Sequence, residues 1–123
     1  MNLESVVIGN VTWQESLQKK ATCDICVGQF RSGAYGVSAV ESMAMSQPVL
    51  GYVNCWTCSM WPELPIVQAT LNNLIKQLQH AIENTTELGA CGRNFVEHYH
   101  SNQQTIKRWK NLITFVSDEK EVS

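Results

Sequence analysis

A chain of 123 residues, 44% hydrophobic and 16% charged, is long enough for one compact domain whose core needs neither metal nor disulfides. Its formal net charge of −2 and its nine scattered Lys and Arg residues argue against a nucleic-acid partner, which a basic stripe would bind. No apolar run approaches the roughly 20 residues that span a bilayer, and residues 1–5 lack the basic region of a secretion signal. We therefore expect no transmembrane segment, a cytoplasmic location and five reduced cysteines.

Short apolar runs that alternate with helical patterns predict an α/β fold. Residues 6–9, 24–27, 48–53 and 65–67 are too short for helices and are predicted as strands. Thr12 and Glu15 have the spacing of a capping box and predict a helix to about Ala21. Residues 36–46 predict a second helix that stops before Pro48. This alternation predicts a small parallel sheet in a partial Rossmann-like, three-layer domain with C-terminal helices.

Residues 55–64 are predicted as an irregular loop, and the carboxyl-terminal third as three helices. The first helix is capped by Thr70 and carries an apolar face of Leu71, Leu74, Ile75, Leu78 and Ile82. The second spans about residues 87–99 and is expected to bury Leu88, Cys91, Phe95 and Tyr99. Within it, Gly89 and Gly92 lower the helix propensity and so indicate close packing against a neighbouring element.

The third helix is predicted to begin at Ser101, which has the capping spacing to Gln104. Its expected buried stripe consists of Ile106, Trp109, Leu112, Ile113 and Val116. The polar residues 117–123 that follow are expected to form a frayed tail.

Residues 29–36 form a glycine-containing turn between a predicted strand and the helix that bears Glu41. Open parallel sheets bind ligands beyond the carboxyl ends of their strands, where free N–H groups near Gly36 and Val37 would attract a diphosphate. Glu41 lies about one turn further on and can accept hydrogen bonds from a ribose diol. The same pattern also occurs in doubly wound proteins that bind no nucleotide, and a glutamate in a helix is often only solvated. The spacing alone therefore leaves both interpretations open.

Residues 33–49 read Gly-Ala-Tyr-Gly-Val-Ser-Ala-Val-Glu-Ser-Met-Ala-Met-Ser-Gln-Pro-Val. This segment resembles the signature of group-1 retaining glycosyltransferases of the GT-B fold, which is Glu-Gly-Phe-Gly, four residues, Glu-Ala-Met-Ala, then Gly-Lys-Pro-Val. The resemblance covers about residues 6–115 and implies that residues 1–123 are a single domain similar to the C-terminal, donor-binding part of such an enzyme. The sequence departs from the signature at Gly33, where the family has its first glutamate, and at Ser46, where it has a glycine.

The resemblance also implies a site and a reaction. Glu41 would bind the donor ribose, and the backbone amides of Gly33, Ala34, Tyr35, Gly36 and Val37 would hold the diphosphate and the sugar. The implied reaction transfers a glycosyl group from a nucleotide diphosphate sugar to an acceptor glycan or lipid, with the acceptor bound by an amino-terminal domain outside this chain. The donor is a substrate, so no cofactor and no metal are expected. No catalytic residue is identified in this half, and Arg31 is the only cation within the loop.

Two alternatives belong to other functional classes. A non-catalytic remnant or interaction module would expose a sheet edge and apolar surface, which favours a homodimer. A zinc or thiol-redox protein is suggested by two C-x-x-C pairs, Cys23 with Cys26 and Cys55 with Cys58.

Different observations argue against the zinc site and against the redox site. Cys23 and Cys26 start an apparent strand, where residues three apart point to opposite faces. Pro62 and Pro65 oppose the long helix that follows a thioredoxin-type motif after residues 55–58. His98 and His100 lie two apart on a predicted helix and so do not form a metal pair.

Overall fold

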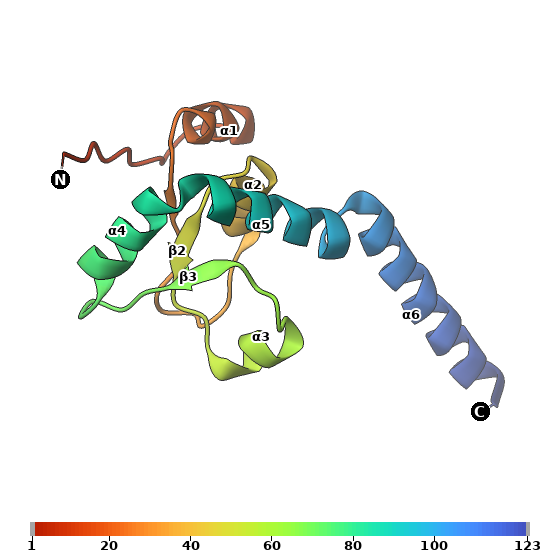
Figure 1. Ribbon diagram of the computed structural model, residues 1–123. Coiled ribbons are helices and arrows are strands. Elements are labelled where there is room, and N and C mark those ends of the chain that lie inside the picture. Colours follow the sequence, from red (N-terminus) through yellow and green to blue (C-terminus); the bar gives the residue numbers. More distant parts are fainter. Residues whose placement is uncertain (1, 123) are drawn as a thin grey trace.

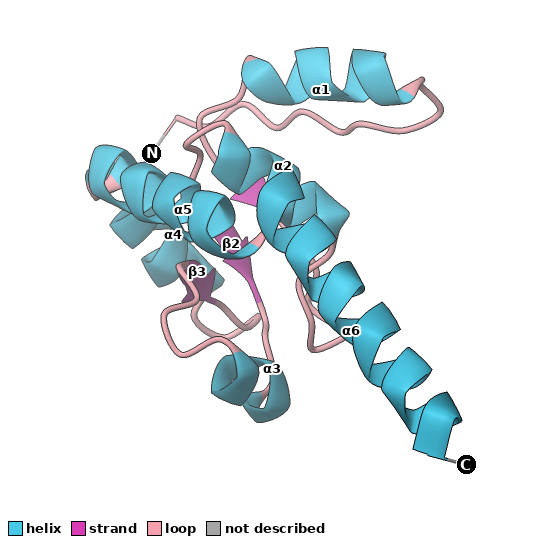
Figure 2. Ribbon diagram, turned by 90° about the vertical axis from the view of Figure 1, so that its right-hand side faces the viewer, coloured by secondary structure: helices cyan, strands magenta, loops and turns pink. Residues whose placement is uncertain are grey.

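The computed structural model describes residues 2–122 as a mixed α/β fold built on a small parallel sheet (Figures 1 and 2). The three strands lie in the order β1 (Cys26–Val27), β2 (Val49–Gly51) and β3 (Ile66–Gln68). Both strand pairs are parallel, with Val49 opposite Cys26 on one side and Ile66 on the other. The helices are α1 (Trp13–Ala21), α2 (Val37–Ala44), α3 (Cys55–Met60), α4 (Leu74–Glu83), α5 (Thr85–Tyr99) and α6 (Asn102–Val122). The predicted α/β class, parallel sheet and C-terminal helices are confirmed.

The strands direct alternate side chains into two separate clusters of buried residues, because successive residues of a strand point to opposite faces. Val49 and Ile66 pack with residues of α2 and α5, including Met43 and Phe95. Leu50 and Val67 pack instead with Ala81 of α4. The short central strand therefore joins both parts of the core.

Helix α1 begins where the sequence predicted. Thr12 Oγ1 accepts a hydrogen bond from the Glu15 amide at 3.2 Å, and Glu15 Oε2 accepts one from the Thr12 amide at 3.0 Å, which completes the capping box. The strand predicted at residues 6–9 is wrong, because this segment forms neither a strand nor a helix and Val7 is 90% exposed. A strand is stabilised by pairing, and β1 offers a ladder of only two residues, Cys26 and Val27.

Helix α2 ends in a Schellman turn. The Gln47 amide donates to the Ser42 carbonyl at 3.0 Å, and the Ser46 amide donates to the Met43 carbonyl at 3.0 Å. Ser46 adopts the left-handed conformation at φ 59° that this turn requires. Glycine adopts that conformation without the steric cost of a Cβ atom, so the serine at this position is strained.

We expect Ser46→Gly to stabilise the protein by about 0.5 to 1 kcal/mol, because the strain of a left-handed serine exceeds the entropy that an added glycine loses on folding. Chemical denaturation of the two proteins measures the difference. The matched variant Ser46→Val should lose stability, because a β-branched residue tolerates positive φ poorly. Equal stability of all three proteins would contradict the left-handed conformation.

Helix α5 approaches α2 closely through its two glycines, as the sequence predicted. A Cβ atom on Gly89 would lie 2.0 Å from the Ser46 carbonyl oxygen, and one on Gly92 would lie 3.1 Å from Met43 Cγ. The buried residues of α5 are Gly89, Gly92, Phe95 and Val96. Cys91 was expected to be buried but is exposed, because it lies outside the face of α5 that these four residues form.

Residues 55–64 do not form the predicted irregular loop throughout, because residues 55–60 form α3. Asn54 caps this helix, and its Oδ1 accepts a hydrogen bond from the Thr57 amide at 3.0 Å. Asn54 is a local signal for the start of this six-residue helix, but the nearby prolines favoured the prediction of a loop.

The apolar faces of α4 and α6 are less buried than predicted. Thr70 does not cap α4, whose N-cap residue is Asn73. Leu74 and Leu78 pack on the core, whereas Leu71, Ile75 and Ile82 are exposed. Helix α6 begins as predicted, with the Gln104 amide 3.3 Å from Ser101 Oγ.

The predicted buried stripe of α6 is exposed along its length, because α6 extends away from the rest of the chain (Figures 1 and 2). Residues 117–122, expected as a frayed tail, continue the helix, and residue 123 lies outside the described part. Among the residues described, no helix is both long and apolar enough to cross a membrane.

Candidate functional site

An open pocket of about 530 Å³ lies where the sequence placed a ligand site. Four of the six predicted binding residues line it, namely Ala34, Tyr35, Gly36 and Val37. The remaining wall consists of Val40, Thr57, Met60, Trp61 and His100. The loops after β1 and β2 both lead into this wall, so the pocket lies beyond the carboxyl ends of two neighbouring parallel strands, where open α/β sheets bind ligands.

Gly33 holds the loop against α3 rather than lining the pocket. Its φ of +71° is left-handed, and a Cβ atom there would lie 2.5 Å from Asn54 Nδ2. The Gly33 carbonyl accepts hydrogen bonds from the Asn54 amide at 2.8 Å and from Thr57 Oγ1 at 3.1 Å. Any residue with a Cβ atom, glutamate included, would be strained here and would have to displace the Asn54 side chain. The geometry therefore gives Gly33 a structural role.

The amino end of α2 faces the pocket through Gly36 and Val37. The N-cap residue Gly36 is extended, at φ −98° and ψ −177°, and it has no side chain to accept a bond from the first helical amides. Those amides, of Val37 and Ser38, are oriented outward at the positive end of the helix dipole. This end of the helix is suited to an anion.

The opposite wall of the pocket is aromatic. The Tyr35 hydroxyl lies 2.8 Å from His100 Nε2, which joins the loop to the end of α5. Trp61 stands edge-on to Phe95 and Tyr99, with ring centroids 5.9 Å and 5.2 Å apart. These contacts fix the Trp61 ring at the pocket wall, where it can stack against a flat ligand group.

Burial shapes the protonation of the Tyr35–His100 pair. It raises the pKa of Tyr35 to about 12, against a smaller lowering by the positive charge of Arg108. Burial, with the Arg108 charge as the second cause, also lowers the pKa of His100 below 6.5. Both groups are therefore neutral near pH 7, and the hydroxyl can donate to a neutral imidazole.

Arg108 is a cation beside the pocket that was not predicted from the sequence. Its guanidinium carbon lies 5.3 Å from the centroid of the Trp61 ring, and its charge acts on two pocket residues, Tyr35 and His100. Nothing in the sequence signals this, because Arg108 belongs to α6 and follows the loop by more than 70 positions. The loop residue Arg31, which the sequence suggested, is exposed and outside the pocket lining.

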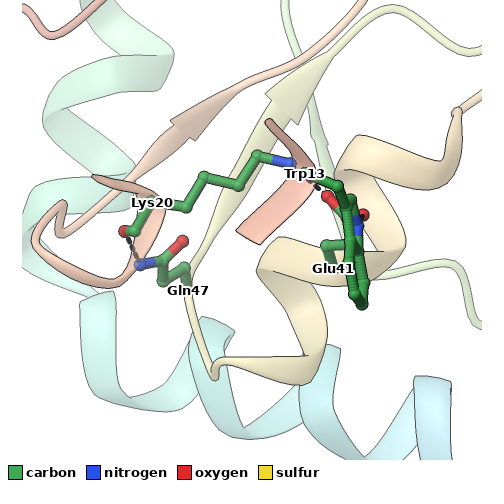
Figure 3. A network of polar contacts seen from close by, with 4 residues as sticks. All are labelled: Trp13, Lys20, Glu41 and Gln47. Carbon is green, nitrogen blue, oxygen red and sulfur yellow. Dashed lines mark hydrogen bonds and ion pairs between the residues drawn. The ribbon is translucent and has the colours of Figure 1, made fainter. Parts of the chain in front are cut away.

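Glu41, the predicted ribose ligand, does not line this pocket. Its carboxylate binds α1 instead, where Oε1 accepts from Trp13 Nε1 at 2.7 Å and Oε2 pairs with the Lys20 ammonium (Figure 3). The Lys20 and Glu41 side chains are only 12% and 16% exposed. The structure therefore separates Glu41 from the glycine turn and gives it partners within the chain.

Gln47 makes the second polar link between α1 and the body. Its Nε2 donates to the Lys20 carbonyl at 2.6 Å (Figure 3) and to the Cys23 carbonyl at 2.7 Å. Because α1 has no buried residue, these polar contacts are important for holding it in place.

The cysteines and histidines do not converge on a metal site. Among residues 2–122, no three His, Cys, Asp or Glu side chains are grouped closely enough to hold an ion. Cys26 packs against the core, while Cys55 and Cys58 are exposed thiols on the first turn of α3. Gln68 Nε2 lies 3.7 Å from Cys58 Sγ. His98 is exposed, with its ring against Tyr99, whereas His100 lines the pocket.

The chain was compared with protein-family models, curated proteins and solved structures. No protein-family model matches the chain, and neither the curated proteins nor the solved structures contain a significant match.

Proposed function

We propose that the protein binds a nucleotide diphosphate sugar in the pocket between the α2 loop and α3, as the donor-binding part of a GT-B retaining glycosyltransferase. The fold proposed for it is a partial Rossmann-like, three-layer domain. The observation that carries this proposal is that Ala34, Tyr35, Gly36 and Val37, the turn that resembles the family signature, line a pocket at the carboxyl edge of a parallel sheet.

The proposed binding site for the diphosphate is the amino end of α2. The amides of Val37 and Ser38 donate to it, the helix dipole favours its charge, and Arg108 supplies a nearby cation. Trp61 and Tyr35 offer aromatic surface to the base or the sugar. During glycosyl transfer these groups would stabilise the charge that develops on the leaving diphosphate, while a further domain holds the acceptor glycan or lipid.

A ribose role for Glu41 requires an exchange of partners. Its side chain is only 16% exposed and its carboxylate faces Trp13 and Lys20 of α1, so α1 would have to move before a ribose diol could reach it. The turn and Arg108 would therefore bind the diphosphate. Glu41 would bind the ribose only in a state where α1 has moved.

Calorimetric titration of the protein with UDP, GDP and ADP tests this proposal. We expect saturable binding of one nucleotide, and Ala34→Asp should weaken it at least about tenfold, because a carboxylate in the pocket repels the diphosphate. Ala34→Asn is the matched control, since it has nearly the same size without the charge, and should bind much as the original protein does. Absence of binding to all three nucleotides by the folded protein would refute a donor site in this chain.

A second pair of variants examines the assigned cation. Arg108→Gln should weaken nucleotide binding and raise the pKa of His100, because it removes a positive charge that lowers that pKa. Lys107→Gln removes the same charge from the neighbouring position of α6 and should change neither quantity as much. NMR titration of the imidazole follows the pKa beside the calorimetry. Equal effects of the two variants would show that Arg108 does not contribute to the site.

A second candidate function, an interaction module, is favoured by a different observation. Large apolar side chains on α4 and α6 are exposed, among them Ile75 at 69% and Trp109 and Ile113 at 61% each. Exposed apolar clusters of this kind mark binding surfaces more often than scattered single residues do.

A further inference from the structure

The apolar side chains of α6 follow a heptad spacing. Ile106, Trp109, Ile113 and Val116 are separated by three, four and three residues, which places them on one side of the helix in the a and d positions of a coiled coil. All four are between 43% and 61% exposed. Leu112 flanks this row and is 50% exposed. We call the four residues the α6 seam.

The seam lies on a helix that projects from the body. Helix α6 follows α5 after a short break at residues 100–101 and extends away from the sheet in both ribbon views (Figures 1 and 2). Its 21 residues correspond to about 31 Å of helix, which is long enough for another helix to pack along it. An isolated helix of this composition gains most of its stability from packing, so an exposed seam indicates a partner.

The charges of α6 identify the kind of partner. Residues 107–110 contain Lys107, Arg108 and Lys110 and carry a net charge of +3, whereas residues 118–121 read Asp-Glu-Lys-Glu with a net charge of −2. Two parallel copies would place like charges side by side. Two antiparallel copies bring the basic half of each helix toward the acidic half of the other, which favours their association.

We propose that the α6 seam is a self-association surface, on which a second copy of this chain packs its own α6 in antiparallel orientation. In the register that brings Lys110 opposite Asp118, the pairing buries Ile113 at the centre of a two-fold interface and Trp109 nearer its ends, so that the same surface of each copy meets the other. The inference is independent of nucleotide binding, because none of the four seam residues lines the pocket.

Sedimentation equilibrium of the full chain over a range of concentrations tests the proposal. We expect a reversible monomer–dimer equilibrium based on the 13.8 kDa chain. Ile113→Glu should raise the dissociation constant by at least about tenfold, because it buries a charge in the seam. Asn111→Glu adds the same charge on the outer face of α6 and should leave the equilibrium nearly unchanged. Far-UV circular dichroism verifies that each variant keeps its helices.

Charge reversal tests the orientation. Lys107→Glu with Lys110→Glu should weaken an antiparallel dimer, since both halves of the helix then carry negative charge. Adding Asp118→Lys and Glu119→Lys should restore the dimer, because the two halves are again complementary. A monomer at all concentrations, a dimer insensitive to Ile113→Glu, or a dimer indifferent to the first charge reversal would each overturn the proposal.

Discussion

Gly89→Ala is expected to lower the free energy of unfolding by about 2 to 3 kcal/mol, a large share of the roughly 5 to 15 kcal/mol of a typical domain. The added Cβ atom would lie 2.0 Å from the Ser46 carbonyl oxygen and 2.9 Å from the carbonyl carbon. Both are backbone atoms of the Schellman turn and cannot rotate away. Helix α5 must therefore move from α2, which loosens the packing of Met43 and Phe95 over the sheet.

Gly92→Ala is the matched comparison, since it makes the same substitution one turn later in the same helix. Its nearest neighbour is Met43 Cγ at 3.1 Å, a side-chain atom that can move aside. The gain in helix propensity, about 1 kcal/mol, is common to both variants and cancels between them. Urea denaturation should therefore show Gly89→Ala as clearly the less stable of the two. Two equally stable variants would contradict the close approach of α5 to the α2 turn.

Glu41→Ala is expected to release α1 from the body and to cost about 1 to 3 kcal/mol. The substitution leaves the Lys20 ammonium without its counterion at 12% side-chain exposure, and it leaves Trp13 Nε1 without its acceptor. Because α1 buries no residue, its amides should lose protection against hydrogen exchange more than those of α5. Glu15→Ala, which removes a carboxylate from the exposed side of α1, should have the smaller effect of losing one capping bond.

The contribution of Glu41 should depend on pH. Burial by itself raises the pKa of this carboxyl, but hydrogen bonds from Lys20 and Trp13, with the Lys20 charge, lower it to a value under 4.5. A carboxyl whose pKa is lowered by folding stabilises the native state above its unfolded pKa, and this stabilisation disappears as the pH falls through the folded pKa. The stability difference between the original protein and Glu41→Gln should thus be constant near neutral pH and shrink in acid. A difference that grows in acid would show that Lys20 does not hold the ionised carboxylate.

The sequence correctly predicted those structural features that depend on residues close together in the chain. The capping box of Thr12 and Glu15, the stop before Pro48 and the glycines of α5 all act within a few residues or through the absence of a side chain, and the structure has each of them. The pocket could be foreseen in the same way, since a turn after a parallel strand has a fixed place relative to the sheet.

What the sequence did not predict depends on contacts between distant segments. Glu41 faces Lys20 rather than the turn because α1 packs beside α2, and helical spacing alone does not specify that neighbour. Arg108 reaches Trp61 only because α6 starts beside the end of α5. The apolar stripe on α6 was expected to be buried within the chain. An apolar period predicts that a helix face packs against something, but it does not say whether the partner is the same chain or another molecule.

The hydrogen bond between Tyr35 and His100 connects positions 65 residues apart, so this contact can form only after both segments have been synthesised. The sheet is complete once Gln68 has emerged from the ribosome, but the wall made by His100 requires α5 to have emerged and docked as well. A nascent chain arrested before residue 100 would hold the strands and the turn with this wall open. The proposed nucleotide binding, measured on arrested chains of increasing length, should consequently begin in one step, after the end of α5 is released, rather than rise gradually with the length of the sheet.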